Sequence, residues 1–301
     1  MDRKTNIGVA EIAAAAFLMS FSGPFVRWAS LNSGAMTFVR TAVPSAVLGV
    51  WLLIRRGFWT GMTRRKFAVL LFASTLNAVR LWLFFESYRL TSVGNAVIVL
   101  YSWPVFTALF GTLLLKERLH PRDGILLAMA FAGMAVVYSG GNFSLGNDDF
   151  LGMTLMLVSA GLYSLMIVLI RREEIERLQS TFWQNLVGAI VYIPAFIGNL
   201  GTAAPSSWMF AGANGLLVGT AGFALFFSAL GRLPAALVGH ISYLEVVFAL
   251  LWSRVIFLEP VGWRHITGAV LIILSMIVRA ELSRREAPAS SGSAGGREAA
   301  R

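Results

Sequence analysis

Long apolar stretches alternate with short polar turns along almost the whole chain. A helix that crosses the hydrocarbon core of a bilayer needs about 20 apolar residues, and the stretches have this length. The pattern predicts an all-α membrane protein with ten transmembrane helices and no connection long enough to hold a soluble domain. The predicted helices are 7–29, 34–54, 67–88, 94–115, 122–139, 150–170, 181–198, 208–230, 235–257 and 262–280.

Prolines and glycines lie inside several of these predicted helices. Proline lacks a backbone N–H and clashes with the preceding turn, so we expect interruptions of the first, second, fourth and seventh helices at Pro24, Pro44, Pro104 and Pro194. Glycine lets another helix approach closely. The eighth helix should have such a contact along the side that carries Gly212, Gly215, Gly219 and Gly222.

One segment of the chain recurs. The stretch 94–138 reads as an apolar helix, a charged turn and a second apolar helix, and the same order returns 142 positions later. Tyr, Glu and Arg keep one register across the turn, so we interpret the chain as a duplication with halves at 1–139 and 150–280. The matched pairs are Tyr101/Tyr243, Val105/Val247, Phe106/Phe248, Leu109/Leu251, Glu117/Glu259, Arg122/Arg264, Met134/Met276 and Val136/Val278.

The distribution of positive charge predicts the topology. With the amino terminus inside, 19 of the 25 Lys and Arg residues fall on the cytoplasmic side and only Arg89 and Arg264 fall outside, so both termini should be cytoplasmic. Five helices per half is an odd number, so the second half should be inverted relative to the first. Inverted repeats are frequent in secondary transporters, with the substrate near the midplane. Residues 281–301 are rich in Ser, Ala, Gly and Arg and should form a disordered cytoplasmic tail.

Composition narrows the function classes. The chain is 57% hydrophobic and 13% charged and has no cysteine, which excludes disulfides, thiolate metal ligation and cysteine nucleophiles. Its three histidines are too scattered for a metal site, and we expect neither a metal nor a cofactor. The net charge of +10 sits at helix ends, so it indicates membrane topology rather than nucleic-acid binding.

Polar residues share one face of the third helix. Ser74, Asn77, Arg80 or Leu81, Phe84 and Ser87 recur at three- and four-residue spacing, and such a face must meet other helices or a cavity. Asn77 and Arg80 could together hold a substrate carboxylate. In the alternative interpretation, Arg80 pairs with Glu86 or Glu11 and only stabilises the fold. Glu86 is also a possible proton carrier.

The ninth helix and four aromatic residues complete the candidate site. His240, Ser242, Tyr243 and Glu245 are close together in a run that suits a water-lined backbone, and His240 or Glu245 could carry a proton coupled to transport. Alternatively, both satisfy polar neighbours between the halves. Tyr101, Trp103, Tyr163 and Tyr243 lie deep in their helices and could surround an amphipathic substrate or could be core packing.

Arginines inside the other helices have less clear roles. Arg40 aligns with Gln184 of the second half, which favours either an interior role or a contact between helices. Arg27, Arg254 and Glu11 lie near the ends of predicted helices. Their side chains are expected to reach the membrane surface.

The unit that closes each half resembles the drug/metabolite transporter superfamily, in its ten-helix EamA-type branch. In the first half, Leu100-Tyr101-Ser102-Trp103-Pro104-Val105-Phe106 leads to Leu115-Lys116-Glu117. In the second half, Tyr243-Leu244-Glu245-Val246-Val247-Phe248 leads to Leu258-Glu259-Pro260, with Val246 in place of the proline of the pattern.

The resemblance covers about 7–280 and implies ten helices around a central cavity, working without ATP. In overall character the chain is similar to bacterial exporters of aromatic and other neutral amino acids. This implies an amino-acid substrate, a multi-pass protein of the bacterial inner membrane and a functional monomer. Efflux of lipophilic cations is the alternative, because Glu245 beside Tyr243 would suit a cation, although arginines in the cavity argue against it. A membrane enzyme acting on lipids is a third class, but no nucleophile or acidic cluster supports it.

Overall fold

A computed structural model describes residues 3–55, 59, 61–116, 121–139 and 147–286. All regular structure in these ranges is helical, as the hydrophobic pattern predicts. Seven helical rods are long and apolar enough to cross a bilayer, and a bent pair at 177–199 would make an eighth. The apolar segment Trp263–Ser275 is shorter. The chain is therefore a multi-pass membrane protein.

The helices follow the predicted order, with more breaks than predicted. The first half contains α1 (Arg3–Ser20), α2 (Ser22–Ala29), α3 (Ser33–Arg55), α4 (Arg64–Leu90), α5 (Val93–Leu100), α6 (Trp103–Leu115) and α7 (Pro121–Tyr138). The second half contains α8 (Asp148–Arg172), α9 (Arg177–Val191), α10 (Ile193–Asn199), α11 (Pro205–Ala213), the π-helix η1 (Asn214–Gly222), α12 (Phe223–Leu230), α13 (Ala235–Ser242), α14 (Leu244–Val255) and α15 (Trp263–Glu286).

Three of the four predicted proline interruptions are present. The chain breaks at Phe21 before Pro24, at 101–102 before Pro104 and at Tyr192 before Pro194, and the last break bends the rod by 51°. The prediction for Pro44 is wrong, because α3 runs through it without a break. Proline removes one hydrogen bond, but an apolar environment and packing on neighbouring helices can hold the rest of the helix together.

The ninth predicted helix also breaks, at Tyr243, although no proline follows. This is the position that matches Tyr101 in the first half, where α5 ends. Ser242 Oγ donates a hydrogen bond to the Val238 carbonyl oxygen at 2.8 Å, a type of bond that often bends helices. The two halves therefore break at equivalent residues, with a following proline in the first half and none in the second.

The last helix is longer than predicted. α15 continues to Glu286 and so includes the first six residues of the segment expected to be disordered, 281–286. This extension is rich in Glu, Leu and Arg, which are good helix formers, and an established helix extends at little cost. The rest of the predicted tail, 287–301, lies outside the described residues, as does Glu117 in the first-half turn.

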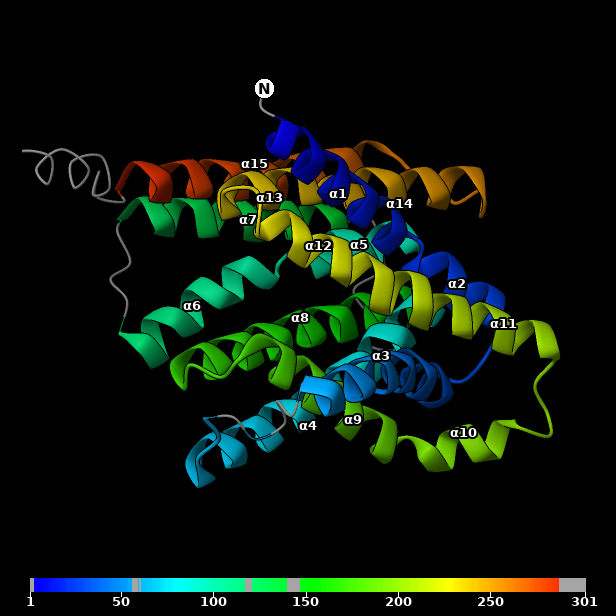
Figure 1. Cartoon of the computed structure of the whole chain (residues 1–301). Helices are drawn as coiled ribbons and strands as arrows, with labels where there is room; N and C mark the ends of the chain where they lie inside the picture. The colour runs from blue at the N-terminus through cyan, green and yellow to red at the C-terminus, as the bar shows by residue number, and fades with distance from the viewer. Residues whose placement is uncertain (1–2, 56–58, 60, 117–120, 140–146, 287–301) are drawn as a thin grey trace, which may run out of the picture.

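The two halves pack against each other along most of their length (Figure 1). α4 contacts α8 and α9, while α1 contacts α12, α13 and α14. The contacts come in related pairs: α1 with α12 corresponds to α8 with α4, and α3 with η1 corresponds to α9 with α4. The helices α7 and α15, the last of each half, lie side by side at one edge.

The eighth predicted helix, which the structure divides into α11, η1 and α12, was expected to make a close helix contact along its glycines. Two of the four glycines allow such a contact, with α3. A Cβ atom on Gly215 would lie 3.0 Å from the Val39 carbonyl oxygen, and one on Gly219 would lie 2.5 Å from Arg40 Nη1. Gly222 meets Met19 less closely, and a Cβ on Gly212 would meet nothing within 4 Å. The surface used for close packing is therefore restricted to the π-helix η1.

Candidate functional site

The polar face predicted for α4 is turned into the protein. Ser74, Asn77, Leu81, Phe84 and Ser87 are all buried, and Asn77 is 4% exposed. Arg80 Nε donates a hydrogen bond to Asn77 Oδ1 at 3.0 Å. The Arg80 guanidinium carbon lies 4.4 Å from the centre of the Tyr163 ring on α8. α4 and α8 therefore hold Asn77, Arg80 and Tyr163 in one cluster.

Arg80 forms neither of the ion pairs that the alternative interpretation named, with Glu86 or with Glu11. Glu86 forms an ion pair with Arg89 at 3.0 Å and accepts a hydrogen bond from Ser33, while Glu11 forms an ion pair with Arg232 at 2.9 Å. Both acids are thus paired with other partners, and Glu11, which was expected to reach the membrane surface, instead lies in the middle of α1 and contacts Ser228 and Arg232 of the second half. Arg80 has no carboxylate within ion-pair distance among the residues that the structure describes.

Trp103 extends the cluster. Its ring meets Tyr163 edge to face, with ring centres 5.6 Å apart, and Ser164 Oγ donates to the Trp103 carbonyl oxygen at 2.5 Å. The same carbonyl oxygen accepts a hydrogen bond from Thr107 Oγ1 of α6 at 2.9 Å, so side chains of both α6 and α8 contact it. Arg80, Tyr163 and Trp103 therefore form a continuous surface of one cation and two aromatic rings.

A second cluster surrounds the breaks at the matched tyrosines. The Tyr101 hydroxyl lies 2.8 Å from Glu245 Oε2, to which it donates, and 2.9 Å from the Ser242 carbonyl oxygen. Tyr101 and Tyr243 are in contact, with ring centres 5.6 Å apart. The contact joins the two matched tyrosines, one from each half of the chain. Tyr101, Tyr243 and Glu245 thus lie together between α5 and α14.

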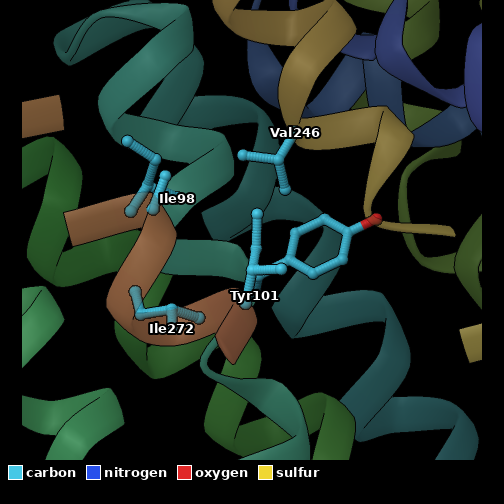
Figure 2. Close-up of a pocket in the computed structure, with 6 residues that line it drawn as sticks. Ile98, Tyr101, Val246 and Ile272 are labelled. Carbon is cyan, nitrogen blue, oxygen red and sulfur yellow. The ribbon is translucent and has the colours of Figure 1, made fainter. Parts of the chain in front are cut away.

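Figure 2 shows the ring of Tyr101 beside a small apolar pocket, with its hydroxyl group directed away from Ile98 and Ile272. The pocket is too narrow to hold a water molecule and is lined by Ile98, Tyr101, Val246, Ala269, Ile272 and Ile273. Its lining includes no ionisable group except the Tyr101 phenol. The hydroxyl of Tyr101 instead meets the acid Glu245.

Tyr163 is near charged groups of both signs. It interacts electrostatically with Arg80, Glu245 and Arg40. The interior of the protein therefore holds two cations and an acid in the neighbourhood of one aromatic ring. This arrangement can bind a small molecule that has charged groups and an apolar body.

The side chains of three predicted site residues are not brought into these contacts. His240 Nε2 is buried and has no hydrogen-bond partner in the described part of the chain. The Ser242 hydroxyl is used within its own helix, and the residue contributes its carbonyl oxygen to Tyr101 instead. Glu86 is likewise held in the separate pair with Arg89.

An ion pair between Arg27 and Glu259 joins the two halves, and the sequence did not predict it. Arg27 does not reach toward the membrane surface, because its Nη1 lies 2.8 Å from Glu259 Oε1 and its Nη2 donates to the Thr91 carbonyl oxygen at 2.7 Å. Glu259 also accepts hydrogen bonds from Ser253 and from the Val93 backbone N–H. The match between Glu117 and Glu259 drew attention to the acid, but nothing in the sequence indicated Arg27 as its partner.

No group of three His, Asp or Glu side chains suited to a metal ion is found in the described ranges. Helices of membrane length with charged groups between them are typical of membrane transporters. The chain belongs to the EamA-like transporter family, which matches residues 6–139 and 150–279. These two matches correspond closely to the halves found in the sequence.

Similar proteins agree with this assignment. The chain is 24% identical to the uncharacterized transporter YxxF of Bacillus subtilis, with 96% of this chain and 93% of the relative covered. It is 22% identical to the mouse solute carrier family 35 member G1, over 90% of this chain and 77% of the relative. One crystal structure shares the fold with a TM-score of 0.62 at 20% identity, covering 94% of this chain and 98% of the other.

Proposed function

We propose that the protein is a secondary carrier that exports small amphipathic metabolites, with aromatic and other neutral amino acids as its substrates. It works by alternating access in the inner membrane of a bacterium, as a monomer. The proposal that it is an exporter rests on the family resemblance, because a carrier follows its gradients in either direction.

The observation that carries the proposal is the unpaired Arg80 beside Asn77 and Tyr163. An arginine in a membrane interior is costly unless an anion or a strong acceptor compensates it. Asn77 supplies one acceptor at 3.0 Å, and the Tyr163 ring lies 4.4 Å from the guanidinium carbon. The remaining guanidinium donors suit a carboxylate, while Tyr163 and Trp103 suit an aromatic or aliphatic side chain.

Glu245 supplies the complementary acid. In the proposed carrier it either receives the ammonium group of the substrate or carries a coupled proton, and Tyr101 orients it through the 2.8 Å hydrogen bond. His240 and Glu86 are the other proton candidates. His240 retains this role in the proposal because its Nε2 has no partner in the described structure.

The proposed topology has ten spans in two inverted repeats around a central cavity, with both termini in the cytoplasm. The related contact pairs between the halves and the equivalent breaks at Tyr101 and Tyr243 support it. Because the chain has no cysteine, single cysteines report topology cleanly. A membrane-impermeant maleimide added to intact cells should label Arg264→Cys but not Thr5→Cys; the opposite pattern contradicts the topology.

Efflux of lipophilic cations is the second candidate. It is favoured by one observation, the acid Glu245 held among the aromatic residues Tyr101 and Tyr243. Against it, Arg80 and Arg40 would repel a cation. Comparing substrates with and without a carboxylate separates the two proposals. Only the amino-acid carrier should prefer substrates that have one.

The test is uptake into proteoliposomes of radiolabelled phenylalanine, threonine and methionine, and separately of a lipophilic cation, with and without an imposed pH gradient. Saturable uptake of an amino acid that Asn77→Ala or Tyr243→Ala abolishes supports the amino-acid carrier. Uptake of the cation alone supports drug efflux and rejects the amino-acid proposal.

A further inference from the structure

Arg40 is a second, half-buried cation near the candidate site. It lies on α3, which packs against α4, the helix that carries Arg80. The two guanidinium groups repel one another, and both interact with Tyr163. Two like charges in a membrane interior are more costly than one, so this arrangement is expected to have a functional reason.

Neither arginine has an acidic partner among the residues that the structure describes. The interior acid Glu245 accepts a hydrogen bond from Tyr101. The other interacting acids are engaged elsewhere: Glu11 with Arg232, Glu86 with Arg89, Glu173 with Arg65, Glu259 with Arg27, and Asp149 with Thr91 and Asn95. Arg40 and Arg80 are therefore free to pair with an anion that the described chain does not supply.

The second half of the protein holds Arg40 in place. Its guanidinium carbon lies 5.5 Å from the centre of the Phe223 ring, and the group occupies the space left by the missing side chain of Gly219. Gly219 belongs to the π-helix η1, a type of helix that is found often at functional sites. Arg40 thus joins the two halves that have to move relative to one another in an alternating-access carrier.

We infer that Arg40 and Arg80 form a two-guanidinium site that binds the carboxylate of the substrate. The inference rests on the proposed carrier function and adds a second anion-binding residue from α3. A carboxylate has two oxygens and accepts forked hydrogen bonds from guanidinium groups, so it can bridge the pair. The carboxylate is then required for binding, and an otherwise identical amine is rejected.

The experiment measures competition with radiolabelled phenylalanine for the purified full-length protein in nanodiscs. The competitors are phenylalanine, 3-phenylpropionate, which lacks the ammonium group, and phenethylamine, which lacks the carboxylate. We expect both acids to compete and phenethylamine not to compete. Arg40→Gln should weaken binding of both acids about 10- to 100-fold, the range for losing a hydrogen bond to a charged group. Arg40→Lys should recover part of this loss.

Arg254→Gln is the matched control, because Arg254 is an exposed arginine near the end of α14 and should leave affinity unchanged. A second pair of variants perturbs Arg40 without removing it. Gly219→Ala places a Cβ 2.5 Å from Arg40 Nη1 and should weaken binding of both acids, whereas Gly212→Ala meets nothing within 4 Å and should not. The inference is overturned if phenethylamine competes as well as phenylalanine, or if Arg40→Gln binds normally.

The inference can also be judged if phenylalanine does not bind at all. Direct binding of labelled 3-phenylpropionate that is lost in Arg40→Gln would support the two-guanidinium site and reject only the amino-acid substrates. Absence of saturable 3-phenylpropionate binding, or binding that Arg40→Gln leaves unchanged, would reject the site.

Discussion

Tyr101 and Glu245 come from opposite halves of the chain, and their side chains meet at 2.8 Å. Tyr101 ends α5 in the first half, and Glu245 lies in the first turn of α14, two residues after the matching Tyr243. The hydrogen bond therefore connects the two positions at which the halves break. A change in the charge of Glu245 acts directly on the contact between them.

Replacing Glu245 tests whether it carries the coupled proton. Glu245→Gln keeps the size of the side chain and an acceptor for Tyr101 but cannot titrate. If Glu245 is the proton carrier, an imposed pH gradient should no longer change the rate of amino-acid uptake, while exchange without a gradient continues. The surrounding titratable groups are the phenols of Tyr101, Tyr88 and Tyr163, which do not titrate near neutral pH in water.

Glu86→Gln and His240→Gln are the comparisons for this prediction. Glu86 is held by Arg89 at 3.0 Å, so its replacement should leave the pH response intact. A response that survives in Glu245→Gln but is lost in His240→Gln would assign the proton to His240 instead. A response that survives in all three variants would show that none of them carries it.

The ion pair between Arg27 and Glu259 should stabilise the contact between the halves. Its side chains are 29% and 13% exposed, and Arg27 also donates to the Thr91 carbonyl oxygen. Removing one member leaves the other charge partly buried and unpaired, so Arg27→Gln or Glu259→Gln should lower stability by about 1–3 kcal/mol. Thermal unfolding in detergent measures this loss.

Two comparisons make the stability prediction specific. The pair of Arg65 with Glu173 has an arginine that is 72% exposed, and Arg65→Gln should change stability by less than about 1 kcal/mol. The double variant Arg27→Gln with Glu259→Gln should lose less stability than the two single variants lose together. Strictly additive losses would show that the two side chains do not interact.

Tyr163 should act through its ring rather than its hydroxyl. The Arg80 guanidinium carbon lies 4.4 Å from the ring centre, and Trp103 packs against the ring edge. Tyr163→Phe keeps both contacts and should retain phenylalanine affinity within about threefold, because it loses at most one modest hydrogen bond. Tyr163→Ala removes the ring and should weaken affinity about 10-fold or more. Equal effects of the two variants would instead assign the role to the hydroxyl.

The sequence predicts the helices and the duplication well, because both depend on local patterns. Apolar stretches of membrane length indicate helices, and the register of Tyr101 with Tyr243 indicates the repeat. Helix breaks are less predictable. Pro104 marks one break, but Pro44 is accommodated inside α3, and the break at Tyr243 has no proline to indicate it.

Pairing within the site could be predicted only in part. The spacing of Asn77 and Arg80 places them one turn apart on α4, and the structure has them hydrogen-bonded. The partners Tyr163, Glu245 and Glu259 come from other helices, and hydrophobic periodicity does not specify how membrane helices are rotated against each other. Arg27 was therefore expected to reach the membrane surface, although it pairs with Glu259 instead.

The most direct test of the carrier is a counterflow measurement. Proteoliposomes are loaded with unlabelled phenylalanine and diluted into a trace of labelled phenylalanine, with Asn77→Ala protein measured in parallel. The account predicts that the label rises transiently above its equilibrium level with the unaltered protein and not with Asn77→Ala. A label that rises only to equilibrium, or an overshoot that Asn77→Ala leaves unchanged, would contradict alternating access at this site.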